Sequence, residues 1–206
     1  MAAELDWDVI PLHRTPSQAR SRAKVTRALE AAERIAERDG VEALTLTAVA
    51  AEADISVGAL YQYLPDRDAI AHALAARYHA RLEALLDEAI ASARAAAPAD
   101  PVGAVIDAVA EVYLDESTTR SLRRATVTDA AARAHKRRMA EKVRELLIAA
   151  KVVPDGDGVD VLARVVFTAS DAVLHDAFTE DEPMRTRLLE ELERMLRAAI
   201  ADTGGR

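Results

Sequence analysis

Apolar residues recur three and four positions apart along most of the chain, which is the spacing of amphipathic helices. In residues 17–38, for example, Val25, Leu29 and Ile35 fall on one helical face. Runs of β-branched and aromatic residues, which would favour strands, are sparse. The pattern therefore predicts an all-α protein. Its expected helices cover 17–38, 45–53, a short segment around 57–64, 67–96, 101–114, 117–126, 128–151, 159–179 and 182–201.

Turn and cap residues separate these segments. Ser17, Thr45 and Asp66 each precede a periodic run and are suited to cap the helix that follows. Asp39-Gly40 is a helix-stop signal, and Pro98-Ala99-Asp100-Pro101 forms the clearest break in the second half. Pro11 and Pro16 indicate that residues 1–16 form an irregular arm.

The composition narrows the class of protein. The chain of 206 residues contains no cysteine, so disulfides and thiolate metal sites are excluded. No apolar run approaches the roughly 18 residues of a membrane span, and the first residues lack the basic and apolar regions of a signal peptide. We therefore expect a cytoplasmic protein with no membrane partner.

The charges are distributed unevenly. The net charge of −8 argues at first against a nucleic-acid partner. However, no acidic residue lies between Asp8 and Glu30, whereas five basic residues do. These are Arg14, Arg20, Arg22, Lys24 and Arg27. Such a local patch is either a solvated helix face or a surface for phosphate contacts.

One stretch, TLTAVAAEADISVGALYQYLPDR, reads as a short helix, a three-residue turn and a second short helix. This is the pattern of a helix-turn-helix, whose second helix enters the major groove of DNA. Asp54 stands in the turn, and aspartate tolerates the left-handed conformation better than most residues. Leu60 and Leu64 are spaced to face inward. Ser56 is placed to cap the second helix and leave its first amides facing phosphate.

The outward positions of this stretch suit close contact with a duplex. Gly58 has no side chain, so the backbone can approach the DNA. Tyr61 and Tyr63 carry hydroxyls that can bind phosphate oxygens, and Gln62 can pair with an adenine edge. A cation at Arg67 opposes the dipole of the helix that begins there, which favours a phosphate partner.

The segment from about Ser17 to Ala73 resembles the DNA-binding domain of the TetR family of bacterial transcriptional regulators. The matching positions are Thr45, Val49-Ala50, Ala53-Asp54, Ile55-Ser56, Gly58-Ala59, Leu60-Tyr61, Tyr63, Leu64 and Arg67. Three positions depart from the family pattern: Asp54 replaces a turn glycine, Leu64 a phenylalanine and Arg67 a lysine. These changes keep the turn, the core role and the charge.

The resemblance implies roles for individual residues. Thr47, Tyr61, Tyr63 and Arg67 would contact phosphates or backbone, Val57, Gly58 and Gln62 would face bases, and the arm from Arg14 to Lys24 would reach the minor groove or the backbone. The full set of expected DNA-binding residues is Arg20, Thr45, Thr47, Ser56, Val57, Gly58, Tyr61, Gln62, Tyr63 and Arg67. Tyr61 as half-buried scaffold and Thr47 as a simple exposed residue are the alternatives.

By the same resemblance, the domains are an irregular arm (1–16), a helix-turn-helix domain (17–66), a helical ligand-binding and dimerisation domain (67–201) and a tail (202–206). The last two helices carry broad apolar stripes that can serve both a core and a second copy of the chain. Aromatic and histidine residues of this region either line a ligand cavity or fill the core: Tyr78, Tyr113, Phe167, Phe178 and His175. His135 lies in a basic run and is expected to be solvated.

No catalytic, cofactor or metal motif is present. Asp155 and Asp157 resemble a calcium loop, but the required acidic ligands are missing further along. The resemblance to the TetR family implies a homodimeric, ligand-responsive repressor. It would bind a pseudo-palindromic double-stranded operator and be released by a small-molecule inducer. Two alternatives are a helical enzyme or carrier with a purely structural helix-turn-helix, and a protein-interaction module that docks through its terminal helices.

Overall fold

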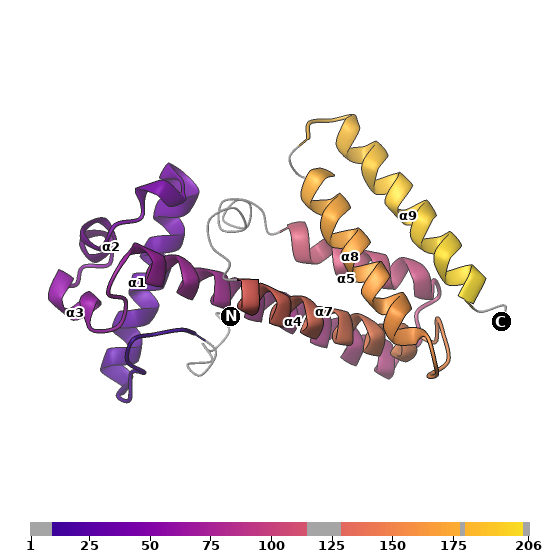
Figure 1. Ribbon diagram of the computed structural model, residues 1–206, viewed down its shortest axis with the longest axis horizontal. Coiled ribbons are helices and arrows are strands. Elements are labelled where there is room, and N and C mark those ends of the chain that lie inside the picture. Colours follow the sequence, from indigo (N-terminus) through magenta and orange to yellow (C-terminus); the bar gives the residue numbers. More distant parts are fainter. Residues whose placement is uncertain (1–9, 115–128, 178–179, 204–206) are drawn as a thin grey trace. The chain divides into compact units, whose positions relative to one another are not determined.

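The computed structural model describes residues 10–114, 129–177 and 180–203, and every regular element among them is helical (Figure 1). The helix expected over 117–126 lies outside the described residues. In chain order the elements are α1 (Ala19–Asp39), the 3-10 helix η1 (Val41–Ala43), α2 (Leu46–Glu52), α3 (Val57–Tyr61), α4 (Arg67–Ala95), α5 (Pro101–Leu114), α7 (Asp129–Ala149), α8 (Val159–Ala177) and α9 (Met184–Thr203). These positions confirm the all-α prediction.

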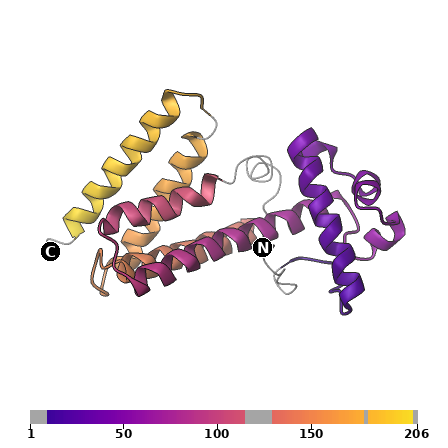
Figure 2. The same cartoon turned by 180° about the vertical axis from the view of Figure 1, so that it is seen from behind.

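The chain forms two compact units. The first contains α1, η1, α2, α3 and the beginning of α4, as far as Arg81. The second begins at Leu82 and contains the rest of α4, α5, α7 from Ala131, α8 and α9. Figure 2 shows the same helices from behind. No described helix has the length and apolar character needed to cross a bilayer.

The first unit is built around a small apolar core. Leu29 of α1, Leu44 before α2, Leu60 of α3 and Ile70 of α4 are fully buried in it. Leu60 is buried in this core, whereas Val57 and Tyr61 of the same helix are exposed. The arm also contributes, since Ile10 is buried in the same cluster.

Caps define the ends of these helices. The Thr45 hydroxyl accepts a hydrogen bond from Ala48 N at 3.1 Å, and the Asp66 carboxylate accepts one from Ala69 N at 2.7 Å, as the sequence predicts. The cap expected at Ser17 is wrong by one position. Gln18 occupies the N-cap of α1, because the Ser21 hydroxyl donates to Gln18 O at 2.8 Å and closes the first turn around that residue.

In the second unit, α8 packs against α9, and both helices pack on α5. Arg197 of α9 donates to both carboxylate oxygens of Asp100, at 3.0 and 2.5 Å, and Asp100 also accepts from Gly103 N at the start of α5. These hydrogen bonds, led by those from Arg197, lower the pKa of Asp100 to about 2. Asp100 therefore caps α5 and connects it to α9 at the same time.

Ion pairs join α4 to α7. Glu83 contacts Arg138 at 2.9 Å, Asp87 contacts Lys142 at 2.5 Å, and Arg94 contacts Glu145 at 3.1 Å. Because residue numbers rise together along both helices, α4 and α7 run parallel in this part of the fold.

His135 corrects an expectation. The sequence context suggests a solvated side chain, but His135 is 7 % exposed and its Nδ1 lies 2.9 Å from Glu83 Oε1. Burial alone would raise the pKa of Glu83, yet the hydrogen bonds from His135 and Arg138 outweigh it and lower that pKa to about 2. The basic run is therefore divided, with His135 packed inward and its neighbours Lys136 and Arg137 facing solvent.

Candidate nucleic-acid interface

The turn between α2 and α3 orients the second helix. Asp54 adopts a left-handed conformation with φ of 52°, as its place in the sequence predicts. Asp54 N donates to Ala51 O at 3.3 Å, and Ile55 N donates to Ala50 O at 3.0 Å. This pair of bonds is a Schellman motif, which ends α2 sharply. The next helix, α3, begins at Val57, three residues after Asp54.

The outer face of α3 is open to solvent. Val57 is 42 % exposed and Tyr61 is 59 % exposed, although both are large side chains that would normally be buried. A Cβ added at Gly58 would meet no atom within 4 Å, and Gln62 is also exposed. Gly58 and Gln62 are therefore accessible from outside, as a role in groove contact requires.

Other expected DNA-binding residues have roles inside the protein as well. The Ser56 hydroxyl accepts from Ala59 N at 3.3 Å, and Thr45 caps α2 as described above. Tyr63 is half-buried against the core. Its carbonyl accepts a hydrogen bond from His13 N at 2.9 Å, which holds the N-terminal arm against the residues that follow α3. Thr47 is exposed on α2.

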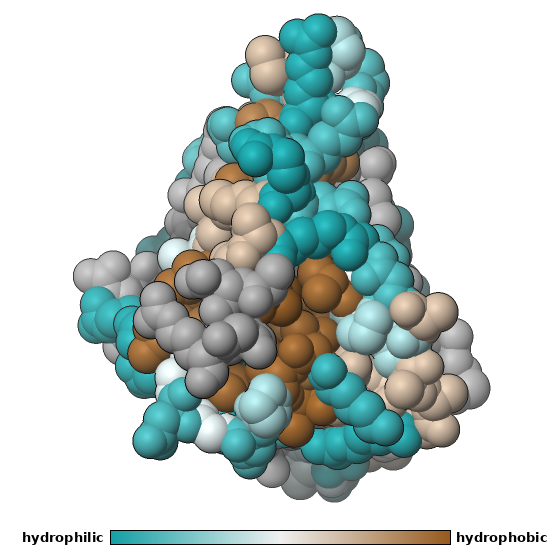
Figure 3. Space-filling view, turned by 90° about the vertical axis from the view of Figure 1, so that its right-hand side faces the viewer, coloured by the Kyte–Doolittle hydropathy of each residue, from teal (hydrophilic) through white to brown (hydrophobic). Residues whose placement is uncertain are grey.

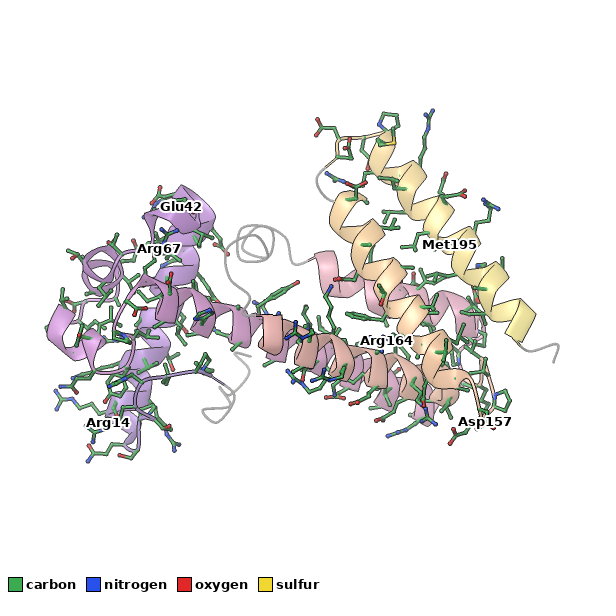
Figure 4. All side chains as sticks on the ribbon, in the orientation of Figure 1. Arg14, Glu42, Arg67, Asp157, Arg164 and Met195 are labelled. Atoms are coloured by element: carbon green, nitrogen blue, oxygen red, sulfur yellow. The ribbon has the colours of Figure 1, made fainter. Side chains whose placement is uncertain are left out.

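Arg67 has an intramolecular partner that the sequence does not reveal. Its Nη2 donates to Glu42 Oε2 at 2.6 Å, joining the start of α4 to η1 (Figure 4). Arg67 and Glu42 are both solvent-accessible, with side chains 42 % and 86 % exposed. The ion pair therefore accounts for a cation at the start of α4 even in the absence of DNA. A DNA phosphate would have to compete with Glu42 for Arg67.

The two ends of α1 differ in how their cations are paired. Towards the C-terminal end, Arg34 and Arg38 contact Glu52 at 3.2 and 3.3 Å, and hydrogen bonds from these arginines lower the pKa of Glu52. At the N-terminal end lies a basic cluster. Within the described part of the chain, none of its members has a carboxylate partner. Its members are Arg14, Arg20, Arg22, Lys24 and Arg27.

Arg22 shows how this basic cluster is held in place. Its Nε donates to Pro16 O at 3.2 Å, and Pro16 itself is buried, so the arm is fastened to the first turns of α1. Arg14, at the end of the arm, projects into solvent (Figure 4). The positive charge on this side of the unit therefore remains available to an external anion.

Of the expected ligand-binding residues, the structure describes the side chains of Phe167 and Tyr78. Phe167 is buried in the second unit, whereas Tyr78 is half-buried in the first. Neither lines the groove described below between α7 and α8. The side chains of Tyr113, His175 and Phe178 lie outside the described residues. Arg144 of α7 contacts Asp155 in the loop before α8 and Asp160 in the first turn of α8, at 2.5 and 2.6 Å, so these carboxylates have a cationic partner within the protein.

This geometry defines a helix-turn-helix protein with a second helical unit, and comparison with known proteins agrees. Residues 28–74 match the family model for bacterial regulatory proteins of the tetR family. Residues 97–198 match the model for the tetracyclin repressor-like C-terminal domain. No curated protein matches the sequence significantly.

Solved structures share the fold. A TetR-family transcriptional regulator from Streptomyces coelicolor is 26 % identical, with 87 % of this chain and 99 % of that chain covered and a TM-score of 0.58. The SmeT–triclosan complex is 19 % identical, covering 87 % and 91 % with a TM-score of 0.60. The multidrug binding protein EbrR complexed with imidazole is 23 % identical, covering 82 % and 92 % with a TM-score of 0.58.

The chain belongs to the TetR family of DNA-binding transcriptional regulators. Members of this family are not enzymes, so the alternative of a helical enzyme with a structural helix-turn-helix is set aside.

Proposed function

We propose that the protein is a homodimeric repressor that binds a pseudo-palindromic operator through α3 and leaves it when a small molecule binds the second unit. The observation that carries the DNA-binding part is the exposed face of α3, formed by Val57, Gly58, Tyr61 and Gln62. Solvent-exposed valine and tyrosine on so short a helix have no role in the core, and they suit contact with base edges and phosphates.

The basic cluster on the arm and on the start of α1 supports the same proposal. Its arginines have no recorded carboxylate partner among the described residues, so contact with DNA phosphates would not first have to break an ion pair. Phosphate contacts of this kind position a protein on the duplex, whereas the α3 side chains would supply sequence preference. Acting on chromosomal DNA, such a regulator would work in the cytoplasm.

Binding can be measured by fluorescence anisotropy with a labelled duplex from the region upstream of the protein's own gene. Tyr61→Ala is expected to weaken binding without changing the salt dependence, because it removes a neutral contact. Arg67→Ala is expected to weaken binding and to make the slope of log K against log salt shallower by about 0.9, the value for one lost phosphate contact. Lys151→Gln, which removes an exposed cation from the second unit, serves as the control. Unchanged affinity in both Tyr61→Ala and Arg67→Ala would contradict the assigned contacts.

Dimerisation is supported by apolar surface on α8 and α9. Val161 and Val165 of α8 are 68 % and 54 % exposed, and Met184 and Met195 of α9 are also exposed. Hydrophobic surface is visible on the side of the second unit that faces the viewer in Figure 3. Exposed apolar side chains on two helices that pack together suit a second copy of the chain. A two-fold dimer would place its two copies of α3 ~34–36 Å apart, which is one turn of DNA.

The dimer can be tested separately from DNA binding. Val165→Glu should shift the protein towards monomer in sedimentation velocity, because it places a charge in the proposed interface. Val57→Glu, the same change at an exposed valine of the first unit, should leave the dimer intact and abolish DNA binding. A monomeric wild-type protein would contradict the dimer, and a Val165→Glu variant that remains dimeric would contradict the assigned interface.

The proposed release by a small-molecule inducer is supported by two similar proteins of known structure. SmeT with triclosan and EbrR with imidazole are both described as complexes with small molecules. In this chain an inducer would favour a state of the dimer that DNA does not, with a coupling free energy typically of ~1–3 kcal/mol. Release of the labelled operator by a small molecule, together with tighter binding of that molecule to DNA-free protein, is the expected result.

A further inference from the structure

A groove of about 670 Å³ lies between α7 and α8 in the second unit. On α7 its lining residues recur three and four positions apart, and on α8 they recur every four, so each helix contributes one continuous face. The lining consists of Arg133, Lys136, Arg137, Ala140, Glu141, Arg144, Asp160, Arg164 and Thr168. Figure 4 labels Arg164 on α8.

The lining is strongly cationic. Among the described residues that line the groove are five arginine or lysine side chains and two carboxylates, those of Glu141 and Asp160, although the chain as a whole carries a net charge of −8. Part of this charge is neutralised within the protein. Lys136 contacts Asp171 at 3.1 Å, and Arg144 contacts Asp160 at 2.6 Å.

Arg137 and Arg164 stand apart from these pairs. No hydrogen bond or ion pair is recorded for either side chain within the described residues, and both are exposed. They come from different helices, Arg137 from α7 and Arg164 from α8, and line the same groove. Each guanidinium presents five N–H donors in a planar fork that fits phosphate or carboxylate oxygens.

We propose that this groove binds a small anion that carries phosphate groups, with Arg137 and Arg164 as its principal ligands. Its volume falls within the range of roughly 300–1,000 Å³ found for small-molecule sites. An arginine-lined wall suits a charged ligand far better than an apolar one, since paired guanidiniums form charge-assisted, bidentate hydrogen bonds with phosphate. The described lining contains none of the expected DNA-binding residues, and neither Tyr78 nor Phe167 belongs to it.

The test uses isothermal titration calorimetry on the full-length protein with inorganic pyrophosphate, at an ionic strength held constant with sodium chloride so that general screening is the same throughout. Saturable binding is expected for the wild-type protein. Arg137→Gln/Arg164→Gln is expected to weaken it at least tenfold, because the variant loses two cationic groups and their charge-assisted hydrogen bonds to phosphate. Arg187→Gln, at an exposed arginine of α9 outside the groove, should bind like the wild type.

Two further arms identify the ligand chemistry. Arg137→Lys/Arg164→Lys keeps the charge but loses the fork, so an intermediate affinity supports bidentate binding. Citrate in place of pyrophosphate separates phosphate from carboxylate chemistry, and equal or tighter binding of citrate would overturn the phosphate assignment. Equal pyrophosphate affinity in the wild type and in Arg137→Gln/Arg164→Gln, or no saturable heat in the wild type, would overturn the site. A double variant that changes the sedimenting species rather than the anion affinity would show that the arginines serve the dimer instead.

Discussion

Arg67 at the start of α4 donates from Nη2 to Glu42 Oε2 at 2.6 Å, so the cation best placed to clamp a phosphate already has a carboxylate partner. Glu42 is almost fully exposed on η1. An ion pair at such an exposed position is weak in water, and a DNA phosphate can therefore displace it. The pair reduces the affinity of the free protein for any anion at this position.

Glu42→Gln is therefore expected to tighten DNA binding by about two- to fivefold, the range that an exposed ion pair accounts for. Anisotropy titrations at low salt measure this effect. Glu88→Gln makes the same charge change on the exposed part of α4 and controls for the general loss of negative charge. Equal affinities for Glu42→Gln and Glu88→Gln would mean that Arg67 does not contact DNA.

The left-handed residues at the ends of α2 and α7 predict a pair of stabilising substitutions. Asp54 and Lys151 have φ of 52° and 59°, and each occupies the same position of a Schellman motif. Glycine adopts this conformation without strain, so Lys151→Gly is expected to raise the free energy of unfolding by about 0.5–1 kcal/mol, and Asp54→Gly by less, because aspartate already tolerates it. Urea unfolding tests both, and a larger gain at Asp54 than at Lys151 would contradict this order.

The contacts of Glu83 with His135 and Arg138 predict a pH-dependent stability. The pKa of Glu83 in the folded protein is about 2, below its ordinary value of 4.5. The stabilisation of the folded protein by ionised Glu83 is therefore complete above about pH 4.5 and is lost as the pH falls towards 2. Glu83→Gln is expected to cost about 1–3 kcal/mol at neutral pH and progressively less between pH 4.5 and 2. Urea unfolding at several pH values measures this, with Glu88→Gln as control; a cost independent of pH in that window would rule out ionisation of Glu83 as the cause.

Ser170 of α8 predicts a substitution that stabilises by removing a polar group. Its hydroxyl is buried and has no hydrogen-bond partner among the residues that the structure describes. A buried unsatisfied hydroxyl is unfavourable, so Ser170→Ala is expected to increase the free energy of unfolding by about 0.5–2 kcal/mol. Ser92→Ala, at an exposed serine of α4, should change it by less than about 0.5 kcal/mol. Thermal and urea unfolding provide the measurement, and a loss of stability in Ser170→Ala would indicate that the hydroxyl has a partner.

Several features of the fold followed from short stretches of sequence. Leu60 and Leu64 were expected inward from their spacing, and both are buried. The left-handed turn at Asp54 and the cap at Asp66 depend on residues within three or four positions, so they too were predictable. The N-cap of α1 lies one residue after the expected Ser17, at Gln18, whose backbone exchanges hydrogen bonds with the Ser21 hydroxyl.

Other features depended on residues distant in sequence. His135 appeared solvated because its neighbours are basic, yet Glu83, on another helix, receives it in a buried contact. The pairing of Arg67 with Glu42 and the meeting of Arg137 with Arg164 in one groove were equally invisible, because no local rule states which helices will pack together.

The sequence by itself determined the all-α class, the described α-helices to within about three residues and the side chains that α3 exposes, since helical periodicity, capping and turn chemistry act over a few neighbouring positions. Only the tertiary structure decided which charges are paired and which remain available. The electrostatic environment of a side chain is set by whichever segments packing brings beside it, and these come from anywhere in the chain.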